Sequence, residues 1–400
     1  MDIIQKRIDL LNNKMLNQVQ KNGYLKSPRY LNSFKTVKRH LFTPSIFEMN
    51  KNIWEELMVN YDNPQTDILE KIYVDRPLVV ALKEDDVLTT SSQPSVMAMM
   101  AEAANIVSGM RVLEVGTGSG YNAAVLAEIT NNQDNIVTME IDRQIFNFAK
   151  ENLIRAGYKK ILIINKDGGF SEPVHAPYDS IIVTCAATDI SKRWIDQLKI
   201  QGTIVVPLAT KGVEVLFLIK KVDDNEMVGT PITYVRFLRL QGISSMINHY
   251  HLESKKFHSF ERLIKNEAKF DKTLNEMFSQ NFHRKKLLDF VFYLSLTEND
   301  MVTYEDVSDE KLGMGYGIWK KDTHSGGLIL VFPGRVIHYG SEEVKNLMMR
   351  HVEEFHAMGN PTLNKYSIEI TSAFKPLEKK HNIYWNIKRR NLNTIFILNK

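Results

Sequence analysis

The stretch Leu113-Glu114-Val115-Gly116-Thr117-Gly118-Ser119-Gly120-Tyr121 decides the fold of this chain. Its apolar beginning is typical of a buried strand, and the sequence from about Asn122 onward is typical of a helix. Between them, three glycines fall at alternate positions. Glycine lets the backbone turn sharply and approach a ligand without obstruction by a side chain. The stretch therefore predicts a strand, a ligand-binding turn and a helix.

Two common glycine-rich sites differ from this one. A dinucleotide site has the spacing G-x-G-x-x-G, and here Tyr121 occupies the position of the third glycine. A phosphate loop ends in Gly-Lys-Ser/Thr, which does not follow here. A dehydrogenase is therefore not expected, and titration with NADH should show no binding.

The sequence on either side of the turn alternates between short apolar runs and amphipathic stretches, from Arg111 to about Leu198. Strands separated by helices need crossover connections, which predict a parallel sheet. The later runs 213–222 and 232–240 leave no room for a helix between them and predict an antiparallel hairpin. The fold class is therefore α/β, with a Rossmann-like sheet in a domain that we place at residues 61–242.

Further segments flank this domain on both sides. Residues 1–60 carry aliphatic side chains at helical spacing, with a break at Pro28, and predict a helical N-terminal cap. Residues 243–400 predict a second, smaller α/β domain, with a boundary near 243–255. Its expected elements are strands at 316–321, 326–333, 366–371 and 383–390 and a helix at 341–359. The aromatic stretch 290–293 is more typical of a core than of a docking groove.

Composition limits the partners of the protein. The chain has 400 residues, of which 44% are hydrophobic and 24% charged, which is typical of a soluble protein with two domains. No apolar run approaches the roughly 20 residues that cross a bilayer, so a cytoplasmic protein without a membrane partner is expected. The net charge of +4 is spread along the chain, so no nucleic-acid partner is expected. The basic clusters 283–286 and 388–390 are interpreted as side chains exposed to solvent. The alternative is that one of the clusters binds an acidic peptide.

The single cysteine limits disulfide and metal chemistry, and no metal site is expected. The single cysteine, Cys185, excludes a disulfide framework within the chain and a multi-thiolate zinc site. It lies in the apolar run 179–187, which favours a buried structural thiol over a nucleophile. His40 is likewise interpreted as structural.

Two acidic residues follow neighbouring strands of the predicted sheet. Glu140 ends the second strand, and its carboxylate could accept hydrogen bonds from both ribose hydroxyls of an adenosine ligand. Asp142 could instead cap the following helix. Asp167 follows the next strand and could receive an adenine amino group, although a turn also favours Asp and Gly there. Together with the glycine turn, these acids indicate a ligand crevice at the strand ends.

Seven segments, in order, give the chain a family resemblance. They are residues 38–44, 73–78, 90–94, 113–121, 167–168, 176–184 and 235–242. On these motifs the chain resembles the protein-L-isoaspartate O-methyltransferases over roughly residues 35–242. The resemblance implies S-adenosylmethionine as cofactor, S-adenosylhomocysteine as product, and a peptide or protein carboxylate as acceptor.

The resemblance also implies site residues. Ser92 would be the hydroxyl that faces the acceptor carboxylate, with Thr90 beside it. An ordinary helix N-cap is the alternative for Ser92. The cofactor-binding residues would be Glu114, Gly116, Thr117, Gly118, Gly120, Tyr121, Glu140, Ile141, Asp167 and Gly168. No general base is expected, because a carboxylate with a pKa near ~4 is already ionised at neutral pH.

The chain departs from the family in two places. It continues for about 158 residues beyond 242, and its acceptor segment 88–94 reads LTTSSQP where the family tends to have a Gly-Gln-Thr-Ile-Ser type of segment. Segments 315–319, 326–333 and 385–389 are similar to appended domains of relatives that modify ribosomally made peptides, among them lanthipeptides. The favoured hypothesis is therefore a tailoring enzyme that methylates an Asp, isoaspartyl or C-terminal carboxylate of a precursor peptide, which docks on the C-terminal domain. The alternatives are isoaspartate repair and a non-catalytic binding module. The oligomeric state is left open.

Overall fold

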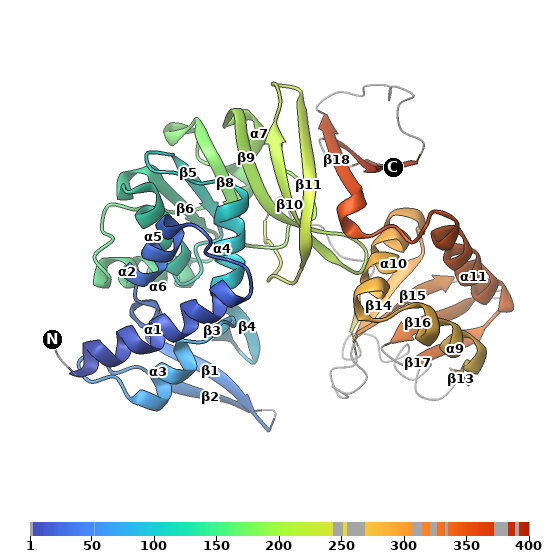
Figure 1. Ribbon diagram of the computed structural model, residues 1–400, viewed down its shortest axis with the longest axis horizontal. Helices are drawn as coiled ribbons and strands as arrows, with labels where there is room; N and C mark the ends of the chain where they lie inside the picture. Colours follow the sequence, from blue (N-terminus) through green and yellow to red (C-terminus); the bar gives the residue numbers. More distant parts are fainter. Residues whose placement is uncertain are drawn as a thin grey trace. The chain divides into compact units, whose positions relative to one another are not determined.

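A computed structural model of the protein describes residues 3–51, 53–242, 251–253, 269–305, 314–320, 326–332, 335–371, 383–388 and 392–399. The chain divides into two compact units (Figure 1). Unit 1 consists of Met1–Val206, Leu218–Met227 and Leu238–Ser245; unit 2 consists of Pro207–Phe217, Val228–Phe237 and Met246–Lys400. The domain boundaries expected at residues 60 and 242 stay predictions, and most of the stretch 243–255 lies outside the described residues.

The N-terminus of unit 1 is helical, as the aliphatic spacing predicts. Helix α1 (Ile3–Lys21) buries Ile8, Met15 and Val19 on one face, and α2 (Pro28–Thr36) begins at the proline that interrupts the pattern. A short 3-10 turn, η1 (Arg39–Phe42), follows. The helical cap expected over residues 1–60 does not extend to its end, because residues 45–58 form a β-hairpin.

That hairpin belongs to a four-stranded antiparallel sheet with the order β2-β1-β3-β4. Its strands are β1 (Ser45–Asn50), β2 (Ile53–Met58), β3 (Leu78–Lys83) and β4 (Asp86–Ser91), and α3 (Thr66–Ile72) precedes β3. Strand β4 leads directly into Ser92 and then into α4 (Pro94–Ala103). The predicted acceptor segment therefore lies between the end of β4 and the beginning of α4.

The Rossmann-like sheet of unit 1 confirms the predicted fold class. Its strand order is β9-β8-β5-β6-β7, and every pair of neighbours is parallel. Along the chain the elements are β5 (Val112–Val115), α5 (Tyr121–Thr130), β6 (Ile136–Glu140), α6 (Arg143–Arg155), β7 (Leu162–Asn165), β8 (Tyr178–Val183), α7 (Lys192–Asp196) and β9 (Leu198–Ala209). Strands and helices alternate except between β7 and β8, which only short 3-10 turns separate. The short 3-10 turns are η2 (Gln133–Asn135), η3 (Gly168–Phe170) and η4 (Pro173–His175).

The expected hairpin after β9 consists of β10 (Glu214–Lys221) and β11 (Glu226–Val235), which are neighbours in the strand order. Only residues 222–225 join them, which is too short for a parallel connection. Strand β11 begins six residues before the expected 232 and ends at Val235. Residues 236–240 are not a continuous strand; Arg239 forms an isolated bridge with Ala186.

Unit 2 contains β19, β20 and β18, followed in the strand order by residues 228–235 of β11 and 214–217 of β10, and a second sheet with the order β12-β14-β15-β16-β17-β13. Its helices are α9 (Lys272–Asn281), α10 (Arg284–Thr297) and α11 (Glu342–Ala357), and η5 (Leu363–Lys365) is a short turn. Its further strands are β12 (His251–Glu253), β13 (Lys269–Phe270), β14 (Met301–Glu305), β15 (Met314–Lys320), β16 (Gly327–Phe332), β17 (Arg335–Gly340), β18 (Tyr366–Thr371), β19 (Tyr384–Lys388) and β20 (Asn393–Leu398). Strands β15, β16, β18 and β19 and helix α11 lie where the sequence predicts them.

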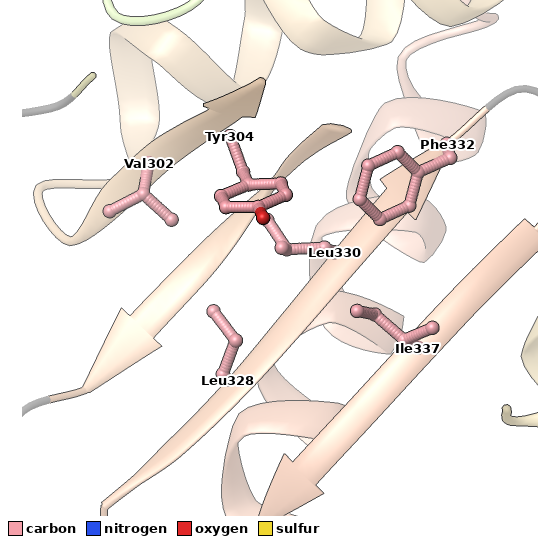
Figure 2. Packing of buried hydrophobic residues seen from close by; sticks show 6 residues of the cluster. All are labelled: Val302, Tyr304, Leu328, Leu330, Phe332 and Ile337. Atoms are coloured by element: carbon pink, nitrogen blue, oxygen red, sulfur yellow. The ribbon is translucent and has the colours of Figure 1, made fainter. Parts of the chain in front are cut away.

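The apolar strands of unit 2 form its core. Strand β16 is buried along its whole length, and its alternate residues Leu328, Leu330 and Phe332 pack with Tyr304 of β14 (Figure 2). The aromatic stretch 290–293 lies in α10 and is buried, as predicted for core residues. Two residues of the basic cluster 283–286, His283 and Lys285, are exposed at the start of α10, and residues 389–390 of the other cluster lie outside the described residues.

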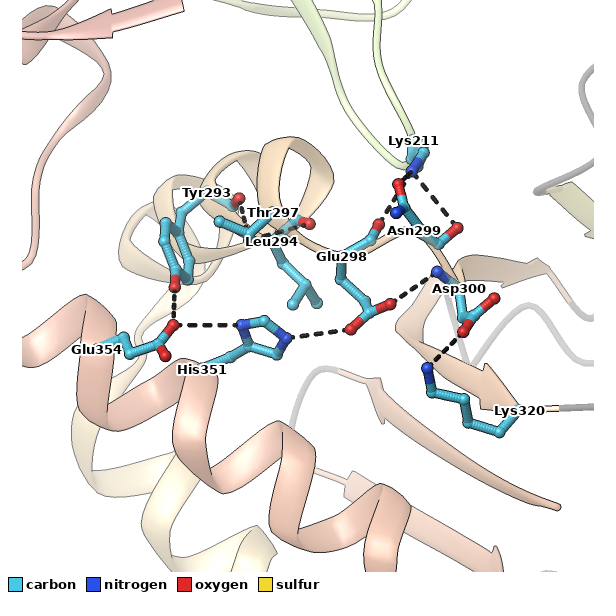
Figure 3. Close-up of polar contacts among 10 residues, drawn as sticks. All are labelled: Lys211, Tyr293, Leu294, Thr297, Glu298, Asn299, Asp300, Lys320, His351 and Glu354. Atoms are coloured by element: carbon cyan, nitrogen blue, oxygen red, sulfur yellow. Dashed lines mark hydrogen bonds and ion pairs between the residues drawn. The ribbon is translucent and has the colours of Figure 1, made fainter. Parts of the chain in front are cut away.

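A polar cluster joins α10 to α11 within unit 2 (Figure 3). The carboxylate of Glu298 lies 3.2 Å from His351 Nε2 and accepts a hydrogen bond from the amide of Asp300. Glu354 accepts a hydrogen bond from the Tyr293 hydroxyl at 2.7 Å. Burial alone would raise the pKa of Glu298, but the hydrogen bonds from His351 and Asp300 outweigh it and lower that pKa to about 2.

Candidate active site

The glycine turn lies at the point where the strand order of the unit 1 sheet reverses. Strands β5 and β8 are neighbours there, and the chain continues from them toward opposite edges of the sheet. Gly116, directly after β5, has φ +97°, and a Cβ atom on it would lie 2.6 Å from Thr184 Oγ1 and 2.6 Å from Cys185 Sγ. Only glycine fits this position, and ligands of open α/β sheets bind in the crevice at such a reversal.

Glu140 faces the same turn from the end of β6. Its carboxylate accepts hydrogen bonds from the amide of Gly118 at 3.2 Å and from the amide of Asp142 at 3.1 Å. Burial raises the pKa of Glu140, and these two amide hydrogen bonds oppose that effect. The structure therefore brings Glu140 and the glycine turn together, as the sequence predicts.

Asp142 is the N-cap of α6, which was the alternative considered for it. Its carboxylate accepts hydrogen bonds from the amides of Gln144 and Ile145 at 2.8 Å and 3.0 Å. Ile141, between the two acids, is partly exposed. A ribose partner at this edge is therefore better supplied by Glu140 than by Asp142.

Glu114 lies behind the turn instead of on its open side. Its side chain is fully buried, and its two oxygens accept hydrogen bonds from Asn122 at 2.7 Å and from the Thr138 hydroxyl at 2.6 Å. The Thr117 hydroxyl lies 2.8 Å from that of Thr138 and extends the network. Burial raises the pKa of Glu114 to about 7. In this arrangement Glu114 joins β5, α5 and β6 beneath the turn, and its contact with the cofactor stays a prediction.

The other residues of the predicted cofactor set lie in three places. Gly120 is the N-cap of α5, and Tyr121 is buried against Phe34 and Phe42. Asp167 accepts a hydrogen bond from the amide of Gly169 at 2.8 Å, which is the turn role considered for it. Gly168 packs against Val115. Asp167 is partly exposed just beyond the end of β7, so the turn role and the predicted adenine contact are compatible.

The acceptor segment lies against the glycine turn. A Cβ atom on Gly118 would lie 3.2 Å from the carbonyl oxygen of Thr90. Thr90 and Ser92 are both partly exposed. The alternative for Ser92, an ordinary N-cap of α4, is wrong, because Gln93 occupies the N-cap position and its side chain makes no capping hydrogen bond. Asp75 instead accepts a hydrogen bond from the amide of Ser95 in the first turn of this helix, at 2.9 Å.

Sequence reasoning missed Arg39 and Asp75. Arg39 is fully buried, and its guanidinium donates hydrogen bonds to five backbone carbonyl groups, among them those of Ser91 and Ser92. Both residues occur in the family motifs, but nothing in a motif shows which carbonyl groups a side chain will reach. His40 is buried, with Nδ1 2.8 Å from the Tyr73 hydroxyl, and its predicted structural role stays a prediction. Burial raises the pKa of Cys185 to about 12, which agrees with an inert thiol.

The residues present fit an adenosine-containing cofactor. The turn has no side chain at 116, 118 and 120, where neighbouring atoms leave little room for one, and carboxylates stand at the end of β6 and just after the end of β7. Within the described ranges, no group of three or more His, Cys, Asp or Glu side chains could hold a metal ion. No helix in the described part of the chain is both long and apolar enough to cross a membrane.

Comparison with known proteins agrees with this geometry. A family model for protein-L-isoaspartate(D-aspartate) O-methyltransferase matches residues 10–245. Over 237 residues the chain is 33% identical to the protein-L-isoaspartate O-methyltransferase of Hyperthermus butylicus, covering 57% of this chain and 88% of that one. It is 32% identical over 228 residues to the protein of the same name from Methanococcoides burtonii, covering 57% of this chain and 98% of that one.

A solved structure extends the likeness in fold beyond that range. It is of a protein-L-isoaspartate O-methyltransferase and matches with a TM-score of 0.53 and 24% identity over 91% of this chain and 98% of that chain. The likeness therefore reaches into the part of the chain that follows residue 245.

The Rossmann-like sheet and its glycine turn define an S-adenosylmethionine-dependent methyltransferase. The chain belongs to the protein-L-isoaspartate(D-aspartate) O-methyltransferase family. It is accordingly a protein carboxyl O-methyltransferase, and the predicted fold class, enzyme class and cofactor are confirmed.

Proposed function

We propose that this enzyme methylates the carboxylate of isoaspartyl residues in peptides or proteins. The observation that carries the proposal is the contact between the acceptor segment and the cofactor turn, where the Thr90 carbonyl lies against Gly118. Ser92, two residues further on, would then present its hydroxyl to a carboxylate beside the methyl donor. Thr90 would line the same place.

The chemistry needs positioning more than proton transfer. The acceptor carboxylate is ionised at neutral pH and supplies the electron pair that forms the new bond to the methyl carbon. The bond from that carbon to sulfur breaks with its electron pair, so no proton moves. S-adenosylmethionine, when bound, supplies the methyl group. Holding the oxygen in line with the methyl–sulfur bond in the absence of water can account for most of the acceleration.

The comparisons favour isoaspartate as the acceptor. The relatives from Hyperthermus butylicus and Methanococcoides burtonii carry the isoaspartate name, and the chain spans most of each. The fold likeness over 91% of this chain includes residues of unit 2, so a long C-terminal part does not by itself indicate a different substrate. This weakens the argument from chain length for a tailoring enzyme.

A second candidate is the methylation of a ribosomally made precursor peptide, such as a lanthipeptide. The observation that favours it is the acceptor segment 88–94, whose sequence departs from the family type where it approaches the cofactor turn. In that case the precursor would dock on the C-terminal domain.

The experiment compares peptides under identical conditions. The enzyme and S-adenosylmethionine are incubated with an isoaspartyl peptide, with the same peptide containing aspartate, and with precursor peptides encoded beside the gene. Mass spectrometry locates each added methyl group. Methylation of the isoaspartyl peptide but not of its aspartyl twin supports the proposal. Methylation confined to one precursor would overturn it in favour of tailoring, and no methylation of any peptide would revive the binding module.

A further inference from the structure

The guanidinium group of Arg39 ties two segments of unit 1 together by backbone hydrogen bonds. Nη1 donates to the carbonyls of Ile72 and Val74 at 3.0 and 2.8 Å. Nη2 donates to those of Arg76, Ser91 and Ser92 at 2.9, 3.1 and 2.9 Å. The turn 72–76 and the acceptor loop 91–92 are therefore held by one planar group, whose fixed geometry sets the distance between them.

No carboxylate of the described residues forms a direct ion pair with Arg39, which is fully buried. The charge of Asp75 acts on it only through space and favours its protonated form. Burial lowers its pKa to about 10, so it stays protonated at neutral pH. A buried cation is costly, and an apolar side chain of similar volume often serves stability as well. What an apolar side chain cannot do is bind five carbonyl oxygens at once.

Asp75 holds the same loop from its other end. It belongs to the turn that Arg39 grips, and its carboxylate accepts a hydrogen bond from the amide of Ser95 at 2.9 Å. The carbonyl of Ser92 is thus fixed by Arg39, and the amide three residues later by Asp75. Ser92 Oγ itself has no hydrogen-bond partner among the described residues, so its hydroxyl is available to a ligand.

We propose that Arg39 is a positioning residue for methyl transfer, and that with Asp75 it fixes the backbone from which Ser92 faces the acceptor. The inference rests on the proposed function of Ser92. Because the Thr90 carbonyl already lies against Gly118, a small shift of the loop changes the distance between acceptor and methyl donor. A misplacement of about 1 Å can reduce turnover on the order of 100-fold.

The test uses Arg39→Lys and Arg39→Met in the full-length protein. Lysine keeps the charge but offers no planar fork, and methionine removes every donor. We expect kcat/KM for the isoaspartyl peptide to fall on the order of 100-fold in Arg39→Met and less in Arg39→Lys. The dissociation constant of S-adenosylhomocysteine, measured by calorimetry, should stay within about twofold. Arg39 donates no hydrogen bond to Glu140 or to the turn glycines, and it meets the end of the glycine stretch only through the ring of Tyr121, 5.9 Å from its guanidinium.

Lys221→Met is the matched control. Lys221 is another buried cation of unit 1, with a side chain that is 5% exposed. Its Nζ donates to the carbonyls of Ile195 and Leu198 at 3.0 and 3.1 Å, away from the acceptor loop. Its loss should lower stability and leave kcat/KM of the folded protein unchanged. Asp75→Ala should resemble Arg39→Lys, whereas Asp75→Asn, which keeps an acceptor oxygen, should restore most turnover.

A second measurement does not depend on the substrate. In Arg39→Lys, amide hydrogen exchange should accelerate over residues 90–97 and stay unchanged over 112–118. Unchanged exchange over residues 90–97 overturns the role of Arg39. A loss of cofactor affinity that matches the loss of turnover overturns it as well. If the wild-type enzyme does not methylate the isoaspartyl peptide, the proposed function fails, and the exchange result still decides whether Arg39 holds the loop.

Discussion

Gly242 lies directly against the carboxylate of Asp167. A Cβ atom at residue 242 would lie 2.1 Å from Asp167 Oδ2, and the φ angle of Gly242 is +87°. Gly242→Ala must therefore displace the carboxylate at the end of β7. If Asp167 holds the adenine end of the cofactor, we expect the affinity for S-adenosylhomocysteine to fall about tenfold or more, measured by calorimetry, because a hydrogen bond to a charged group is worth about 1.5–3 kcal/mol.

Gly157→Ala is the control for the effect of backbone strain alone, without a contact to Asp167. Gly157 has φ +88°, and nothing lies within 4 Å of the position of its Cβ atom. Both substitutions impose a strain of roughly 1–2 kcal/mol in the left-handed region. Only Gly242→Ala should also lose cofactor affinity; equal affinities in the two variants would exclude Asp167 from the cofactor site.

Ser92 and Glu140 should have separable roles. Glu140→Ala removes the carboxylate that faces Gly118, so we expect weaker cofactor binding, on the order of tenfold. Ser92→Ala should lower kcat about tenfold to 100-fold at nearly constant cofactor affinity, since its hydroxyl would donate a hydrogen bond to the acceptor carboxylate, and such a bond to a charged group is worth about 1.5–3 kcal/mol. Steady-state kinetics and calorimetry on both variants test this separation of roles. A loss of cofactor affinity in Ser92→Ala as large as that in Glu140→Ala would refute it.

The sequence predicted the parts of this site that depend on neighbours along the chain. Strand β5, its turn and α5 were predicted because hydrophobic period and glycine spacing are local signals, and Asp142 was recognised as a possible cap for the same reason. The hairpin of β1 and β2 was missed. Burial falls steadily along β1 instead of alternating, so the segment offers no strand period and was interpreted as a continuation of the preceding helices.

Arg39 could not be predicted in this way. Its carbonyl partners lie 33 to 53 residues away along the chain, and an arginine followed by His-Leu-Phe has no pattern that indicates a buried cation. Glu114 shows the same limit: the family resemblance implied a cofactor contact, whereas its hydrogen bonds to Asn122 and Thr138 depend on how α5 and β6 pack. Backbone position is encoded locally, but the direction of a buried polar side chain is not.

Burial of Glu114 makes stability depend on pH near neutrality. Burial raises its pKa to about 7 from 4.5, so the native protein keeps a proton that the unfolded chain releases. The stabilisation is complete below pH 4.5 and is lost as pH rises to about 7. At about 1.36 kcal/mol for each pH unit, the loss reaches roughly 3 kcal/mol. The free energy of unfolding of Glu114→Gln, measured in urea from pH 5 to 8, should not show this loss. If it falls with pH as steeply as that of the wild type, burial of Glu114 is not the cause of the pH dependence.

Glu298 should give unit 2 the opposite dependence, in the acid range. Its pKa is about 2 in the native protein and 4.5 ordinarily, so its hydrogen bonds stabilise the fold above pH 4.5 and are lost as pH falls toward 2. Glu298→Gln should lower stability by about 1–3 kcal/mol at neutral pH and reduce the acid dependence. Amide exchange of α11 between pH 2.5 and 6 measures this, with exposed Glu353→Gln on the same helix as control. If both variants show the acid dependence of the wild type, the contact of Glu298 with His351 does not stabilise the packing of α10 on α11.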